Sequence, residues 1–318
     1  MTAPGGGALL VVGDVITDVV AVHAGPLVPA TDTAASIRTL PGGAGANAAC
    51  WAAYAGLDRV GLLARVGGDD TAGWHERALT EAGVRPLLVR DAQAPTGTVI
   101  SLVDGTAERT FLTDGGAALR LSPADWHPRL LAGTDHLHIS GYLFFAEPAR
   151  ELALLALTTA VEQGVPVSVD PASAGFLAAR GPGAFLAAVR GASVLLPNAD
   201  EALLLSAALP EEDGAAGEAA AVAGGTDPVE AAAARLSREV PLVVVTRGSA
   251  GAVVAEEGRV TAVVPGMTAA AVDTTGAGDA FTGGFLAARL RGASAVGAAR
   301  AGCRAGAEAV TRIGGRPG

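Results

Sequence analysis

The sequence predicts an α/β fold, a doubly wound and mostly parallel sheet flanked by helices, with a small β-sheet lid. Short apolar runs recur along the chain and alternate with Ala/Leu-rich stretches long enough for helices. Strands that alternate with helices form a parallel sheet covered on both faces. In the N-terminal third, extended segments follow one another without helices between them, so they need a second sheet. The length of 318 residues is enough for one large core, and we expect a single domain over residues 1–318.

The strands of the main sheet are predicted by uninterrupted apolar runs. Residues 8–12 (ALLVV) precede Gly13-Asp14 and predict a buried strand that ends in a turn. Runs of the same kind predict strands at 165–170, 192–197 and 241–246. The clearest helices of the alternation are expected at 151–163, 198–209 and 229–240.

The lid is predicted by extended segments near a turn signal. Residues 98–103 and 108–113 flank Asp104-Gly105 and predict a hairpin. Residues 36–40 predict another short strand. We assign the lid strands to about 14–22, 36–40 and 96–113. The Ala/Gly-rich and acidic stretch 211–227 predicts a surface loop.

Composition excludes several classes of protein. The net charge of −10 and the aromatic content of 4% argue against nucleic acid and anionic membranes as partners. Two cysteines, Cys50 and Cys303, lie far apart and offer no disulfide framework, which indicates a reducing cytoplasm. No apolar run reaches the length of a secretory signal or a membrane span. The chain has no lysine, which excludes a Walker-A loop and a Schiff-base site for pyridoxal phosphate.

A glycine cluster near the C-terminus carries the strongest chemical signal. In Asp273-Thr-Thr-Gly-Ala-Gly-Asp279 the glycines precede an apolar helical run, 280–290. A Gly-x-Gly turn at a helix start directs several N–H groups at one point, which forms an anion site reinforced by the helix dipole. Asp279 then stands beside that site as a proton acceptor. The alternative is a tight turn in which Asp279 only caps the helix.

A second glycine cluster, Pro41-Gly42-Gly43-Ala44-Gly45-Ala46-Asn47, also opens a predicted helix. Its glycines allow a ligand to approach the backbone closely, and Asn47 supplies a donor and an acceptor for polar oxygens. The alternative is a packed helix start without a ligand. In this order along the chain, the two clusters resemble the two signature regions of the ribokinase-like (PfkB) carbohydrate kinases, and the resemblance extends over residues 9–316.

The resemblance implies an ATP-dependent kinase that phosphorylates a hydroxyl, expected to be a primary one, of a small sugar or sugar derivative. Asp279 would be the catalytic base, and the backbone of Gly276, Ala277 and Gly278 would hold the migrating phosphoryl group. On the sugar side the family pattern matches Asp18, with Asp14 as the less favoured candidate. The other sugar residues that it implies are Gly42, Gly43, Asn47, Arg109 and Glu147.

On the nucleotide side, the resemblance implies ATP bound with Mg²⁺. Asn198 and Glu201 match an Asn-x-x-Glu motif near the metal and phosphates, and Thr246, Gly248 and Gly251 match a turn near the phosphates and ribose. A plain helix start and a hairpin turn are the respective alternatives. The family pattern further implies a monovalent cation site, with K⁺ held by Asp273, Thr275 and the backbone oxygens of Ala309, Arg312 and Gly314.

The chain departs from ribokinases at Ile16 and Ala44, where those enzymes usually carry Asn and Lys; ribose is therefore not singled out as the substrate. A nucleoside kinase of the adenosine or pseudouridine type remains an alternative, although the lid carries a single aromatic residue, Phe111. A catalytically dead sugar sensor would have to lose the base or the glycine site, and both are present. We also expect a homodimer formed through the lid.

Two histidines are set aside at this level. His136 and His138 alternate on a predicted strand and share a face, which is compatible with metal binding. No third ligand lies within reach in the sequence, so a structural role is favoured.

Overall fold

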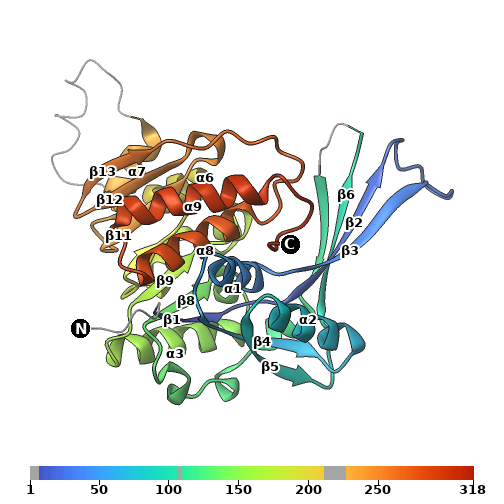
Figure 1. Cartoon of the computed structure of the whole chain (residues 1–318), viewed down its shortest axis with the longest axis horizontal. Coiled ribbons are helices and arrows are strands. Elements are labelled where there is room, and N and C mark those ends of the chain that lie inside the picture. The colour runs from blue at the N-terminus through green and yellow to red at the C-terminus, as the bar shows by residue number, and fades with distance from the viewer. Residues whose placement is uncertain (1–6, 106–108, 211–226) are drawn as a thin grey trace.

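The computed structural model describes residues 7–105, 109–210 and 227–318, which form two β-sheets (Figure 1). The larger sheet has the order β13-β12-β11-β10-β9-β8-β1-β4-β5. Its strands are parallel from β5 to β11, and β11, β12 and β13 pair antiparallel. Their bounds are β1 Ala8–Val12, β4 Arg59–Gly67, β5 Val84–Asp91, β8 His136–Ser140, β9 Val167–Asp170, β10 Val194–Leu195, β11 Leu242–Thr246, β12 Ala252–Glu256 and β13 Arg259–Val264.

Helices cover both faces of the large sheet. One face carries α1 Ala44–Tyr54, α2 Asp70–Glu81, α8 Ala277–Leu290 and α9 Ala295–Ala309. The other carries α3 Ala149–Glu162, α4 Ala174–Arg180, α5 Pro182–Ala188, α6 Ala199–Ala207 and α7 Pro228–Leu236. Strand β1 shows why: alternate side chains point to opposite faces, so Leu9 and Val11 join one core and Leu10 and Val12 the other. The predicted doubly wound fold is confirmed.

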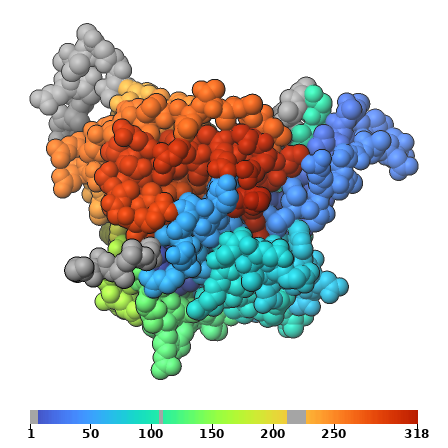
Figure 2. Space-filling model, in the orientation of Figure 1, coloured from blue at the N-terminus to red at the C-terminus, as the bar shows by residue number. Residues whose placement is uncertain are grey.

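The smaller sheet is the lid, and it projects from the body of the molecule (Figures 1 and 2). Its strands are β2 Ile16–His23, β3 Ala35–Gly42, β6 Gly97–Val103 and β7 Arg109–Asp114, in the order β3-β2-β6-β7. Strands β6 and β7 form the predicted antiparallel hairpin, and β2 pairs with β6 in parallel. The lid joins the body at the start of β2, shortly after β1 ends, and at the end of β3, directly before α1 begins.

The sequence missed part of the large sheet. Strands β4 and β5 were not predicted, because they interrupt their apolar residues with arginines and carry mixed burial instead of one continuous apolar run. Strand β10 is shorter than the predicted 192–197 and keeps only its central pair in the ladder. Most of the predicted loop 211–227 lies outside the described residues.

Cys50 and Cys303 are buried free thiols, as expected from their separation. No helix in the described ranges is long and apolar enough to cross a membrane.

Candidate active site

The predicted polar residues meet at the carboxyl edge of the parallel strands, where open α/β sheets bind ligands. Of these, Asp14 follows β1 and Thr246 ends β11, whereas Asp170, which the sequence did not single out, ends β9 at the same edge. Asn198 follows β10 and forms a bridge with Thr246, which brings two predicted nucleotide residues side by side. The first turn of α8, which carries Asp279, is placed at the same edge by its contacts with α1.

The first turn of α8 keeps its backbone donors available. Gly276, the residue before the helix, adopts φ 72°, and no side chain caps the turn. The first normal helical bond runs from Ala280 N to Gly276 O at 2.8 Å. Ahead of it, Ala277 N makes only a long contact of 3.4 Å with Thr274 O, and the N–H groups of Gly278 and Asp279 have no backbone partner in the described chain. These are the backbone N–H groups at which the sequence predicts an anion site.

Asp279 is fixed by the other glycine cluster. Asn47 Nδ2 donates to Asp279 Oδ2 at 2.8 Å, a contact across 232 residues of sequence. Burial raises the pKa of Asp279 to about 8, and the negative charges of Asp170, Asp14 and Asp18 add to the rise, while the Asn47 bond opposes it. A carboxylate with a pKa near the working pH suits a general base.

Asp18 and the Gly42-Gly43 backbone, which the sequence predicts to bind the sugar, lie against each other. A Cβ on Gly42 would lie 2.1 Å from Asp18 Oδ2, so the carboxylate rests directly on this glycine. Gly43 adopts φ 95° and approaches the Asp14 carbonyl too closely for any side chain. Burial raises the pKa of Asp18 to about 6, with Asp14 adding to the rise and Arg316 opposing it. Asp18 therefore retains a carboxylate that faces the cluster.

Asp14, the second candidate, has a structural task. Its carboxylate accepts from Ala44 N at 2.9 Å and Gly45 N at 3.1 Å, so it caps α1 from outside the helix. Ser140 Oγ donates to the same carboxylate at 3.3 Å. These bonds fix α1, and with it Asn47, relative to β1. Asp14 therefore has a structural role, and Asp18 stays the sugar residue that the sequence predicts.

The segment 314–316 joins the two glycine clusters, a connection that the sequence did not predict. Gly315 packs between Asn47 and Gly276. A Cβ placed on Gly315 would lie 2.3 Å from Asn47 Nδ2, and a Cβ placed on Gly276 would lie 2.5 Å from the Cα of Gly315. Arg316 Nη2 donates to Gly42 O at 2.9 Å. The Nε and Nη1 atoms of Arg316 are enclosed and have no hydrogen-bond partner in the described structure. No local motif marks Arg316, so only the fold reveals it.

The Asn-x-x-Glu pair caps α6. Asn198 Oδ1 accepts from Glu201 N, and Glu201 Oε2 accepts from Asn198 N, both at 2.9 Å. This reciprocal capping box is the plain alternative considered above, and it leaves Asn198 Nδ2 and Glu201 Oε1 outside the cap. Burial raises the pKa of Glu201 to about 7, and Asp170 adds to the rise. The cap and a role near phosphates are therefore compatible.

The turn after β11 carries the remaining nucleotide candidates. Gly248 adopts φ 55° and a Cβ there would meet nothing within 4 Å, whereas Gly251 at φ 97° is packed against Val264 O. Arg247 N donates to Gly251 O at 2.7 Å and closes the turn. Gly248 is thus the open position and Gly251 the structural one.

The predicted cation ligands are only partly brought together. The Asp273 carboxylate accepts from Thr275 N at 2.8 Å and from Gly314 N at 3.0 Å. Arg312 N donates to Ala309 O at 3.2 Å, which uses that carbonyl to end α9. Asp273, Thr275 and Gly314 form one unit beside the anion site.

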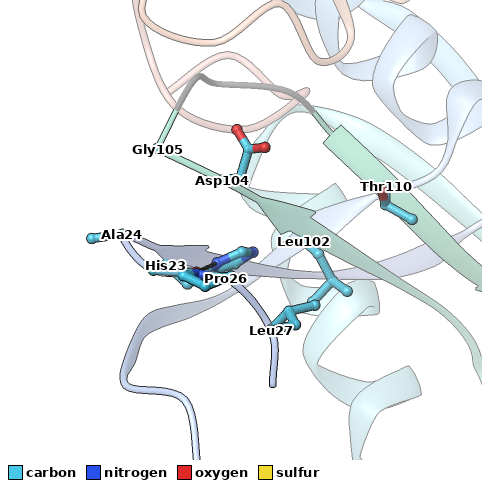
Figure 3. Close-up of a pocket in the computed structure, with 9 residues that line it drawn as sticks. His23, Ala24, Pro26, Leu27, Leu102, Asp104, Gly105 and Thr110 are labelled. Atoms are coloured by element: carbon cyan, nitrogen blue, oxygen red, sulfur yellow. Dashed lines mark hydrogen bonds between the residues drawn. The ribbon is translucent and has the colours of Figure 1, made fainter. Parts of the chain in front are cut away.

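Glu147, one of the predicted sugar residues, makes its described hydrogen bonds outside this cluster. Glu147 bonds locally to Arg150 and to Glu151 N, at 3.4 and 3.3 Å, and lines a cavity of about 270 Å³ with Arg180. The backbone of Arg109 pairs with Val103 in the lid, and its side chain lies outside the described part. A larger cavity of about 770 Å³ lies at the far end of the lid between His23, Leu102 and Thr110, and none of the predicted residues lines it (Figure 3).

Comparison with known proteins identifies the family. The model described as pfkB family carbohydrate kinase matches residues 8–318. The chain belongs to the PfkB family. This PfkB kinase is 33% identical over 286 residues to a fructokinase from Klebsiella pneumoniae, covering 88% of this chain and 84% of the relative. It is 34% identical over 267 residues to an ATP-dependent ribose-1-phosphate kinase from Halopiger xanaduensis, covering 82% and 78%.

Solved structures agree on the fold of this PfkB kinase. Ribokinase from Thermotoga maritima superposes with a TM-score of 0.77 at 26% identity, covering 97% of this chain and 94% of that one. A ribokinase II from E. coli, solved with ATP and Mg²⁺, gives a TM-score of 0.80 at 24% identity, covering 97% and 94%. The chain is accordingly an ATP-dependent carbohydrate kinase, and the family, fold and activity expected from the sequence are confirmed.

Proposed function

We propose that this PfkB kinase transfers the γ-phosphoryl group of ATP to a hydroxyl of a small sugar or sugar derivative, with Asp279 as the base. The observation that carries the proposal is the first turn of α8. The carboxylate of Asp279 is held by Asn47 Nδ2 in the same turn whose N–H groups lack backbone partners. A proton acceptor and an anion site therefore lie one residue apart.

The reaction follows from this placement. Asp279 accepts the proton of the sugar hydroxyl as its oxygen forms a bond to the γ-phosphorus. The bond from the γ-phosphorus to the bridging oxygen breaks, and ADP carries away that electron pair. The N–H groups of Ala277, Gly278 and Asp279 would stabilise the charge on the phosphoryl oxygens. Because Gly278 has open space where a Cβ would stand, the phosphoryl group can approach the backbone there.

The residues present fit a magnesium ion bound mainly by phosphate oxygens and water. No group of three potential metal-ligating side chains exists among the residues that the structure describes, and Mg²⁺ in kinases commonly takes only one or two protein carboxylates. Glu201, on the nucleotide side, would hold it in this way. The ion, when bound with ATP, would offset the phosphate charge. Asp18 and the Gly42–Gly43 backbone would orient the sugar hydroxyls at the other end.

A sugar is favoured over a nucleoside by two observations. The relatives above 30% identity are named as kinases of fructose and of ribose 1-phosphate. The described lid offers Phe111, which is 55% exposed, as its aromatic side chain, whereas a nucleoside base calls for stacking partners. Nucleoside kinase activity remains the second candidate, since adenosine kinase from Sinorhizobium meliloti shares the fold at a TM-score of 0.83.

An ADP-release assay across pentoses, hexoses, ketoses, their phosphates and nucleosides tests the function. One acceptor class should support turnover, and Asp279→Asn should lower kcat by about 10²–10⁴ while ATP binding persists. Asp58→Asn is the matched control, because Asp58 is an exposed carboxylate outside the site. Turnover of the Asp279→Asn variant near the wild-type rate would refute the mechanism.

Three further features belong to the same proposal. Asp273, Thr275 and Gly314 would hold K⁺ beside the anion site together with the backbone oxygens of Ala309 and Arg312, so adding K⁺ to the assay should raise turnover. The chain would act as one kinase domain and pair through the lid as a homodimer. Glu147 would contact the sugar only after the start of α3 moves toward Asp18, and Arg109 stays a sugar residue predicted by the sequence. The cytoplasmic location and the lack of nucleic-acid partners stay predictions of the sequence.

A further inference from the structure

A buried chain of polar side chains crosses the large sheet and ends at the candidate active site. His136 Nε2 and His138 Nδ1 each lie 2.9 Å from Ser168 Oγ. His138 Nε2 lies 3.1 Å from Asp170 Oδ2. The residues His136, His138 and Ser168 are buried, whereas the Asp170 side chain remains 18% exposed. This row of hydrogen-bonded side chains is therefore buried at His136 and reaches the edge of the sheet at Asp170.

The register of β8 and β9 explains this arrangement. Leu137, Ile139, Val167 and Val169 pack into the core under α3 to α7. Their neighbours in sequence point to the opposite face, which α1, α8 and α9 cover. In the parallel ladder His138 pairs with Ser168, and Ser140 pairs with Asp170. The two histidines, Ser168 and Asp170 therefore lie on the same face of the sheet.

The chemistry of these groups fixes the direction of the hydrogen bonds. A carboxylate can only accept, so His138 carries its proton on Nε2 and donates to Asp170. In a neutral His138 ring, Nδ1 then accepts from Ser168 Oγ, and the serine oxygen accepts from His136 Nε2. Burial lowers the pKa of His136 to about 3, so this ring is neutral. These hydrogen bonds thereby set a single tautomer for His138.

Asp170 stands among other acids of the site. Burial is the main cause of the raised pKa values of Asp14 after β1, Tyr142 in the turn before α3, Glu201 in α6 and Asp279 in α8, and the negative charge of Asp170 adds to each rise. Asp279 also faces Asp14 and Asp18 on the sugar side and Asn47 on α1. Repulsion from these carboxylates favours a rotamer of Asp170 that turns away, and the His138 bond opposes that rotation.

We propose that His138, set by Ser168 and His136, is a positioning residue that holds the Asp170 carboxylate toward Asp279 and Glu201 in the phosphoryl-transfer site. This inference rests on the proposed kinase function and goes beyond it, because neither the histidine pair nor Asp170 belongs to the predicted site. The pair that sequence alone left without a role is thereby joined to the chemistry.

A matched pair of substitutions tests the proposal. His138→Gln keeps a donor near the position of Nε2, whereas His138→Asn keeps an acceptor near Nδ1 and loses the bond to Asp170. The Asn variant should lose about tenfold in kcat and the Gln variant at most about twofold, since outer partners of functional groups typically contribute at this level. Equal losses in both variants would overturn the proposal and leave His138 a packing residue.

The pH profile adds a readout that packing would not move. If Asp170 turns away, Asp279 loses a negative neighbour and ionises more easily. The acid limb of kcat/KM should then shift to lower pH in His138→Asn and in Asp170→Asn, and stay in place in His138→Gln. A shift in Asp170→Asn without one in His138→Asn would show that Asp170 does not depend on His138.

The tautomer can be read without turnover. Nitrogen-15 spectra of the ligand-free wild-type enzyme should show His138 protonated on Nε2 and bare on Nδ1, and the opposite tautomer would contradict the proposal. This readout keeps it testable if a variant fails to fold. Failure of the kinase mechanism would appear separately, as full turnover in Asp279→Asn with the His138 tautomer unchanged.

Discussion

At the scale of single residues, the candidate site places acids where water is scarce. Asp279, Asp18 and Glu201 all have pKa values raised first by burial and then by neighbouring carboxylates. Arg316 is the cation that opposes this at Asp18. Perturbed pKa values of this kind are typical of functional sites, where they lower the stability of the fold.

The raised pKa of Asp279 predicts a pH-dependent gain in stability when its charge is removed. The carboxyl titrates near 8 in the folded state and near 3.8 unfolded, so the folded chain binds more protons between these values and loses stability as pH rises. Asp279→Asn should therefore melt at a higher temperature than wild type at pH 8, and this gap should shrink toward pH 5. Thermal melts across that range measure it. A gap independent of pH, or an equal gain in the exposed control Asp58→Asn, would contradict the prediction.

At the scale of elements, the two glycines at the start of α8 differ in conformation and in packing. Gly276 requires φ 72° and close packing on Gly315, whereas Gly278 lies in the helix with open space before it. The fold requires glycine at position 276, whereas at position 278 the proposed approach of a phosphoryl group would require it.

Alanine substitution at these two glycines should separate folding from activity. Gly276→Ala should lower the melting temperature, because its Cβ would meet the Gly315 backbone at 2.5 Å. Gly278→Ala should melt like wild type or slightly higher yet raise KM for ATP or lower kcat, because its methyl group would occupy the phosphoryl site. Melting curves and steady-state kinetics of both variants decide. Normal kinetics in Gly278→Ala would mean that the phosphoryl group does not approach this turn.

At the scale of the whole molecule, the lid leaves an apolar face uncovered. Ile37 is 65% exposed and Leu112 56%. Leu112 pairs with Ile100, and Ile100 pairs with Val19 of β2. Ile37 pairs with Ala21, which lies two residues further along β2 and so on the same face. These side chains alternate with the row that contains Asp18, so they lie on the face of the lid turned from the sugar side. A face of this kind suits burial against a second lid.

A charge on that face should therefore dissociate a homodimer. Ile37→Arg should shift the mass measured by light scattering from dimer to monomer, with no loss of melting cooperativity. Leu155→Arg is the matched control, since Leu155 is 41% exposed on α3, away from the lid. A wild-type chain that is monomeric at micromolar concentration, or a dimer unchanged in Ile37→Arg, would rule out this interface.

Much of the site was predictable because its signals are local. The glycines before α8 and α1 mark helix starts at which backbone N–H groups can face a ligand, and this signal lies within a few residues. The apolar runs of β1, β9 and β11 are needed by any parallel sheet with two covered faces. Glu147 and Arg109 show the limit, since their motifs gave no information on which cavity or strand row would receive them.

What the sequence determined by itself is the alternation of strands and helices, the order of the glycine motifs and hence the family. These depend on interactions within a few residues. Only the tertiary structure decided that Asn47 holds Asp279, that Asp14 caps α1, that Arg316 enters the sugar side and that His138 reaches Asp170. Each of these is a contact between distant segments whose existence depends on strand order, and each pKa shift depends on burial that no stretch of sequence contains.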